Sequence, residues 1–278
     1  MKNILKIMLM MITIFTIAGS AVYAAEIPVS DQDQLITSND WTEISNLQDE
    51  MKKEEPDATI DYDKALKVYV DCNLIKLQTA DTKKLTSALE SANYVWVIPF
   101  KMEKTYGMFT VAKGLPLREE AKSVLTKAEQ EEVKNHAGKW MITETAEHTV
   151  EPYYDILLEK REALSDCTRV VLVGSQPGMR QPVALGMDDE TARIWISLGY
   201  QYPVMEKIPE TQNVESGVYS FDSVAEISDT YIEDSEVSTG AGVQSRSSMK
   251  YVAGIGIIVI GSILILSVLK KKKLEDYE

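Results

Sequence analysis

Short apolar runs recur along the middle of the chain and predict β-strands. The run at 94–100 is apolar at every position, which is typical of a strand buried on both faces. The run at 105–112 follows it closely and is expected to be its hairpin partner. Strands are predicted at 64–70, 94–100, 105–112, 139–146, 168–175, 182–187 and 192–198.

Helical signals lie between these runs. Asp81 is placed to cap a helix with one apolar face. Thr126 and Glu129 have the spacing of a capping box, and Gly138 suits the end of that helix. Thr149 is predicted to cap a third helix that continues to about residue 164.

The order strand, helix, strand, hairpin therefore occurs twice. It predicts one α+β domain at 57–204, with a largely antiparallel sheet covered by helices and room for a twofold β-α-β-β arrangement. Residues 25–56 are expected to form a polar leader with a short amphipathic helix, in which Trp41, Ile44, Leu47 and Met51 share one face. Residues 205–250 are expected to be an acidic, disordered stalk, with a short strand around 218–224 as the one exception.

Both ends of the chain carry long apolar segments. Residues 1–24 have the charged start, apolar centre and small residues of a secretory signal peptide, with an uncleaved signal anchor as the alternative. Residues 251–269 contain no charge, and as a helix they would span about 28 Å, which predicts a transmembrane helix. Lys270, Lys271, Lys272 and Lys273 follow directly as the membrane stop, so 270–278 is predicted to be a cytoplasmic tail and the domain to lie outside the cell.

The residues before this apolar segment suggest how else the chain could be attached. Thr239 and Gly240, a short spacer, the apolar segment and the lysines together resemble a Gram-positive sortase sorting signal. Glu236 and Val237 stand where the LPxTG motif has Leu and Pro. The resemblance covers only this end of the chain, and it leaves attachment to the cell wall open beside simple membrane anchoring.

The charge of the chain restricts its partners. A formal net charge of −14 at pH 7 repels nucleic acid and anionic lipid, so neither is expected to bind. The chain also has no Asn-x-Ser/Thr sequon, which together with the lysine stop favours a bacterial envelope.

Cys72 and Cys167 are the only cysteines, and both lie in the predicted exterior domain. An oxidising exterior permits a disulfide between them, which would contribute about 4–5 kcal/mol by closing a long loop. Two separate buried thiols are the alternative, because spacing alone does not show proximity.

Chemical motifs are scarce. His136 and His148 belong to no metal-binding pattern, and the acidic turn at 188–190 lacks the spacing of a calcium loop. Trp96, Trp140 and Trp195 fall in strand runs, where core packing is the usual role. No catalytic residue, metal or cofactor is therefore predicted.

The expected function is that of a single-pass, membrane-anchored bacterial surface protein. Its exterior domain would bind an unknown extracellular protein or ligand without catalysis. An envelope enzyme that uses carboxylates, or an accessory subunit of a membrane complex, are the alternatives.

Overall fold

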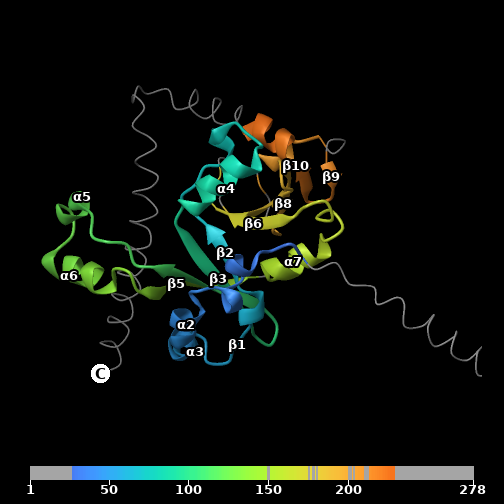
Figure 1. Cartoon of the computed structure of the whole chain (residues 1–278). Helices are drawn as coiled ribbons and strands as arrows, with labels where there is room; N and C mark the ends of the chain where they lie inside the picture. Colours follow the sequence, from blue (N-terminus) through green and yellow to red (C-terminus); the bar gives the residue numbers. More distant parts are fainter. Residues whose placement is uncertain are drawn as a thin grey trace, which may run out of the picture.

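The computed structural model describes residues 27–148, 151–174, 176, 179, 181–199, 202, 204–209 and 213–228. These residues form one ten-stranded sheet with helices packed on it, so the α+β class with a largely antiparallel sheet is confirmed (Figure 1). The strands are β1 (Thr59–Ile60), β2 (Leu66–Tyr69), β3 (Tyr94–Lys101), β4 (Tyr106–Lys113), β5 (Trp140–His148), β6 (Arg169–Val173), β7 (Val183–Met187), β8 (Ala192–Ser197), β9 (Asn213–Glu215) and β10 (Val218–Ser220).

The sheet joins two antiparallel halves through one parallel pair. The order is β5-β4-β3-β2-β6-β7-β8-β10-β9, with β1 added to β3. Within it β2 and β6 run parallel, with Val68 opposite Leu172, and the other named strands pair antiparallel. Two segments that are far apart in the chain therefore meet at the centre of the sheet.

This strand order is not the twofold β-α-β-β arrangement that the sequence analysis allowed. In the first half β2 and β3, which flank the first long helix, are neighbours. The corresponding strands of the second half, β5 and β6, are separated by β4, β3 and β2. The same series of elements is thus placed differently, because β5 extends the hairpin of β3 and β4 instead of starting a second unit.

The longer helices mostly occupy the positions that their caps predict. Asp81 accepts hydrogen bonds from the backbone of Lys83 and Lys84 and so caps α4 (Thr82–Glu90). The capping box of Thr126 and Glu129 begins α6 (Lys127–His136). The third helix, α7 (Tyr153–Glu159), starts later than predicted, because β5 continues to His148 and Pro152 is the N-cap. It also ends earlier, at Glu159. The remaining helices are α2 (Trp41–Ile44), α3 (Gln48–Glu54), α5 (Glu119–Lys122), a helix at 221–228, and the 3-10 turns η1 (Asp31–Asp33), η2 (Leu35–Thr37), η3 (Ser45–Leu47), η4 (Tyr62–Lys64), η5 (Ile75–Leu77) and η6 (Met205–Lys207).

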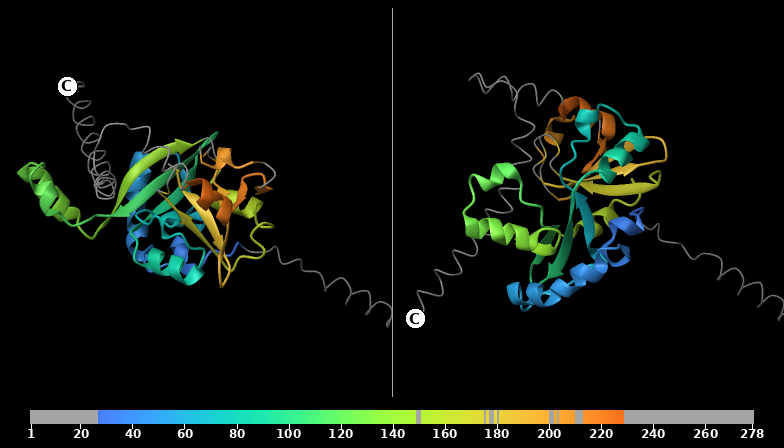
Figure 2. Two further views of the ribbon diagram at one scale, coloured as in Figure 1. Left: turned by 90° about the horizontal axis from the view of Figure 1, so that it is seen from above. Right: turned by 60° about the vertical axis from the view of Figure 1, so that its left-hand side comes forward.

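The core consists of three apolar clusters on the two faces of the sheet. One face of β6, β7 and β8 is covered by α4 and by the helix at 221–228, and the opposite face by α7. The face of β3 and β4 is covered by η2, α2 and α3. In contrast, α5 and α6 form an arm between β4 and β5 that projects away from the sheet (Figure 2). None of the residues of α6 is buried, so this helix does not cover the sheet as predicted.

The folded domain is longer at both ends than the predicted 57–204. Ile27, Val29 and Leu35 of the predicted leader are buried, as are Ile44 and Met51 of its amphipathic helix. At the other end, β9, β10 and the helix at 221–228 complete the sheet and its cover, and Phe221 stacks on Trp195 with ring centroids 5.7 Å apart. The part of the predicted stalk at 205–228 that the structure describes therefore belongs to the domain.

The predicted membrane-related segments lie outside the described residues. This applies to the signal peptide at 1–24, the remainder of the stalk at 229–250, the transmembrane helix at 251–269 and the lysine tail at 270–278. Among the helices that the structure does describe, none is long and apolar enough to cross a bilayer.

Candidate functional site

Polar side chains gather on one face of β3, β2 and β6, where the parallel pair lies. Lys67 pairs with Trp96 across the β2–β3 ladder, and Tyr69 pairs with Tyr94, so these four side chains share that face. Leu66 and Val68 alternate with them and point into the cluster on the opposite face. The period of two along β2 thus places a lysine among aromatic rings.

The N-terminal segment crosses this face and brings a carboxylate to it. Val29 bridges to Val170 of β6 and Gln34 bridges to Leu66 of β2, which holds the segment across the parallel pair. Asp33 lies between these two bridges in the chain and is only 2% exposed. The segment that looked like a solvated leader is therefore part of the site.

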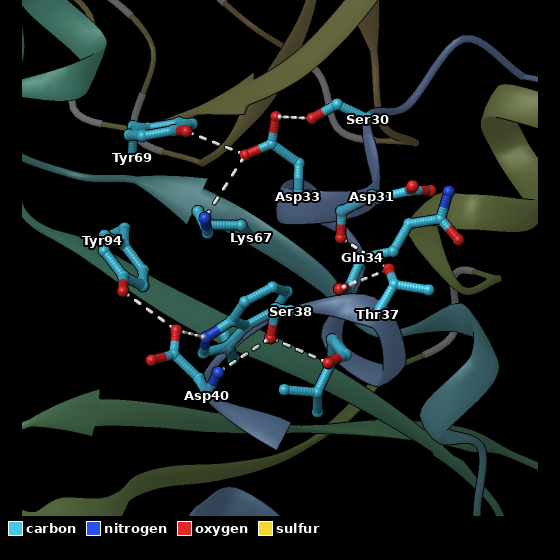
Figure 3. Close-up of polar contacts among 12 residues, drawn as sticks. Ser30, Asp31, Asp33, Gln34, Thr37, Ser38, Asp40, Lys67, Tyr69 and Tyr94 are labelled. Carbon is cyan, nitrogen blue, oxygen red and sulfur yellow. Dashed lines mark hydrogen bonds and ion pairs between the residues drawn. The ribbon is translucent and has the colours of Figure 1, made fainter. Parts of the chain in front are cut away.

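Asp33 organises the polar cluster (Figure 3). Its carboxylate accepts hydrogen bonds from the hydroxyl groups of Tyr69 at 2.8 Å and Ser30 at 2.6 Å, and from Nη2 of Arg169 at 3.0 Å. Nζ of Lys67 lies 3.6 Å from the same carboxylate. One buried carboxylate thus faces two cations, Lys67 and Arg169.

The ammonium group of Lys67 lies close to three aromatic rings. Nζ is 4.6 Å from the ring centroid of Tyr94, 5.2 Å from that of Trp96 and 5.9 Å from that of Tyr69. Such contacts stabilise a cation but supply no hydrogen-bond acceptor for its three N–H groups. The side chain is 10% exposed, and Nζ makes no hydrogen bond with any residue that the structure describes.

A second carboxylate, Asp40, lies beside the same rings. Its Oδ2 accepts hydrogen bonds from the hydroxyl group of Tyr94 at 2.9 Å and from Nε1 of Trp96 at 3.0 Å (Figure 3). Its Oδ1 accepts no hydrogen bond from the described part of the chain. Asp40 therefore retains an acceptor that the fold does not use.

Lys67 and Asp40 both line an open pocket of about 300 Å³, here called the Lys67 pocket. Its volume is at the lower end of the range of small-molecule sites. It is lined by polar residues that come mainly from the N-terminal segment. The lining residues are Asp31, Gln32, Thr37, Ser38, Asn39, Asp40, Lys67 and Tyr94.

The two tyrosines of the site are kept protonated. Burial and the Asp33 carboxylate raise the pKa of Tyr69, and burial and the hydrogen bond to Asp40 raise the pKa of Tyr94. Both hydroxyl groups therefore act as hydrogen-bond donors to carboxylates at neutral pH. They position Asp33 and Asp40 and are poorly suited to accept a proton from a ligand.

A second hollow, of about 240 Å³, is lined in part by Asp71, Cys72 and Asn73. Here the polar group is satisfied within the fold, because Asp71 accepts hydrogen bonds from the backbone N–H and the side-chain amide of Asn93. The Lys67 pocket is the better candidate, since its charged groups retain unused donors and acceptors.

The structure contains no disulfide between Cys72 and Cys167, the pair that the sequence analysis considered. Cys72 and Cys167 are both free and buried, and they belong to clusters on opposite faces of the sheet. Burial raises the pKa of Cys72 to about 12 and that of Cys167 to about 11. Both therefore behave as buried thiols, the alternative that the sequence also allowed.

The other candidates from the sequence lie apart from the Lys67 pocket or have structural roles. Trp96, Trp140 and Trp195 are buried. Trp96 touches the site through Lys67 and Asp40, and the ring of Trp140 packs on that of Tyr94 with centroids 5.9 Å apart. Asp188 stabilises its own turn by accepting hydrogen bonds from the backbone of Glu190 and Thr191. The residues described include no group of three or more His, Cys, Asp or Glu placed to hold a metal ion. The lysines at 270–273 lie outside the described residues.

The sequence pattern did not identify Asp33, Asp40 or Lys67 as site residues. The available signal was Lys67, a charge that interrupts an otherwise apolar strand. A charged side chain in a buried strand must find a partner, but the sequence does not show which one. Comparison of the chain with models of protein families, with curated proteins and with solved structures finds no match.

Proposed function

We propose that this chain is a membrane-anchored bacterial surface protein whose exterior domain binds a small polar ligand in the Lys67 pocket without catalysis. The anchor and the orientation rest on the apolar segment at 251–269 and the lysines that follow it. The binding role rests on the pocket, where the ammonium group of the largely buried Lys67 makes no hydrogen bond with the residues that the structure describes.

The single observation that carries the proposal is the environment of Lys67. Removing an ammonium group from water costs several kcal/mol, and one carboxylate shared with Arg169 offsets this only in part. An apolar residue would pack among the same rings without that cost. A lysine whose N–H groups face an open pocket is explained by a ligand that supplies the missing acceptors.

Blocking the pocket is the direct test of this function. Asn39 lines the pocket, is exposed and makes no hydrogen bond within the described residues, so Asn39→Trp should fill the pocket without disturbing the core. Calorimetric titration of the full chain with a set of small polar compounds should show binding that Asn39→Trp abolishes. The matched control Asn135→Trp, on the exposed arm, should leave binding unchanged. Binding that survives Asn39→Trp would place the site elsewhere.

Anchoring needs a separate test, because it does not depend on the pocket. Protease added to intact cells without an outer barrier should remove the exterior domain and leave a tag at the C-terminus protected. Digestion of that tag would show that the lysine tail is outside and that the proposed orientation is wrong.

A further inference from the structure

Two groups in the Lys67 pocket remain available to a ligand, and they have opposite charges. Nζ of Lys67 lies over the ring of Tyr94, 4.6 Å from its centroid, and the hydroxyl group of the same tyrosine donates to Oδ2 of Asp40 at 2.9 Å. The ammonium group of Lys67 and the carboxylate of Asp40 therefore contact the same tyrosine, one at the ring and the other at the hydroxyl group. Both residues line the same pocket.

The charges of the pocket discriminate between classes of ligand. The lining residues include one cation, Lys67, and two carboxylates, Asp31 and Asp40, on a chain of net charge −14. A multiply charged anion would be repelled by the carboxylates, and a simple cation would leave Nζ of Lys67 without an acceptor. An uncharged sugar would add no carboxylate beside Lys67, which shares Asp33 with Arg169, and no cation beside Asp40. A zwitterion supplies a partner to each group and adds no net charge.

We propose that the ligand is a zwitterion of the size of an amino acid or a dipeptide. Its carboxylate accepts hydrogen bonds from Nζ of Lys67, and its ammonium group donates to Oδ1 of Asp40. This inference rests on the proposed function, since it assigns the ligand class of the same pocket.

The uncharged part of the wall fits a short peptide. Gln32 and Asn39 are exposed at the pocket and make no hydrogen bond within the described residues. Their amides can both donate to and accept from a peptide group. Thr37 and Ser38 instead donate to the backbone of their own segment, so they shape the wall.

The test compares charged ligands with their blocked forms on the full chain in mild detergent. The probes for calorimetric titration are alanine, alanyl-alanine, N-acetylalanine, alaninamide and glucose. At least one zwitterion, alanine or alanyl-alanine, should bind. N-acetylalanine and alaninamide should bind at least tenfold more weakly, because each loses one charge-assisted contact.

Variants test the assigned contacts. Lys67→Met and Asp40→Asn should each weaken binding of the zwitterion at least tenfold. Lys76→Met and Asp49→Asn change exposed residues of the same types outside the pocket and should leave the affinity unchanged. If Lys67→Met fails to fold, Asp40→Asn and the blocked ligands still decide the question.

Two results would overturn the inference. If blocked and zwitterionic ligands bind equally, or glucose binds instead, the ligand class is wrong, while binding in the Lys67 pocket stands as long as Asn39→Trp abolishes it. If neither zwitterion binds at millimolar concentration, the inference is wrong as well. The proposed binding role itself fails if no small polar compound binds the full chain, or if Asn39→Trp leaves that binding intact.

Discussion

Replacing Asp33 with asparagine tests whether one buried carboxylate holds the site and the N-terminal segment together. Asp33 is 2% exposed, and its two oxygens accept hydrogen bonds from Tyr69, Ser30 and Arg169. Asparagine preserves the shape of the side chain. It removes the negative charge and presents an N–H₂ group to one of these donors.

The expected loss of stability follows from the charges that remain after the substitution. Without Asp33 both Arg169 and Lys67 stay in a largely buried region, with side chains 17% and 10% exposed, and no longer have their shared carboxylate. Removing one partner of a buried ion pair typically costs about 3–5 kcal/mol. We expect a loss in this range, which is a large fraction of the about 5–15 kcal/mol that stabilises an ordinary domain.

Urea denaturation of the full chain, followed by tryptophan fluorescence, measures this loss. The control is Glu131→Gln, which breaks the ion pair of 2.6 Å between Glu131 and Lys134 on the exposed arm. That pair is solvated, so its loss should cost less than about 1 kcal/mol. Adding Lys67→Met to Asp33→Asn should restore part of the stability, because it removes one of the two uncompensated cations.

The reasoning is refuted if Asp33→Asn lowers the free energy of unfolding by less than about 1 kcal/mol at an unchanged m-value. Asp33 would then not compensate the two cations. The interpretation that Lys67 holds a poorly compensated positive charge at the pocket would then be wrong.

Three further predictions concern other parts of the domain. Phe221→Ala should lower the free energy of unfolding by about 3–5 kcal/mol, because the ring is buried and stacks on Trp195. The control Val214→Ala, at a side chain 56% exposed, should change it by less than about 0.5 kcal/mol. Equal losses in urea denaturation would contradict the C-terminal boundary of the domain. Burial and Asp33 raise the pKa of Tyr69 above its ordinary value of 10.0, so the folded chain keeps a proton that the unfolded chain releases, and stability should fall as the pH rises above about 10. Tyr69→Phe should make that alkaline decline shallower, and an unchanged pH profile would count against it. Iodoacetamide at about pH 8 should spare both buried thiols in the folded chain and modify both after unfolding in urea, while a cross-linked peptide pair before reduction would contradict the free cysteines.

Local features of the sequence were sufficient for most of the strands and for the helix starts at Asp81 and Thr126. The apolar run at 94–100 became β3, and its predicted hairpin partner became β4. A strand is recognisable because its side chains alternate between faces or are apolar throughout. A cap is recognisable because its hydrogen bond joins residues only a few positions apart.

The predicted domain boundaries, 57 and 204, differ from those of the structure because they too were inferred from local composition. Residues around Asp33 are polar and aperiodic, so they resembled a leader, and the acidic composition after 204 resembled a stalk. Yet a few apolar residues in each segment, such as Leu35 and Phe221, are buried against the sheet. Segments that contribute a short cover to a core need only a few apolar positions, and these leave no periodic pattern.

The sequence by itself determined the α+β class, most of the strand positions and the helix starts at Asp81 and Thr126, because each depends on neighbouring residues. The tertiary structure alone decided the strand order, the extent of the domain and the site. Asp33 and Arg169 are 136 positions apart, and they meet only because β2 and β6 pair in parallel beneath the N-terminal segment. Their contact is set by the packing of whole faces of the sheet, which no local pattern of residues encodes.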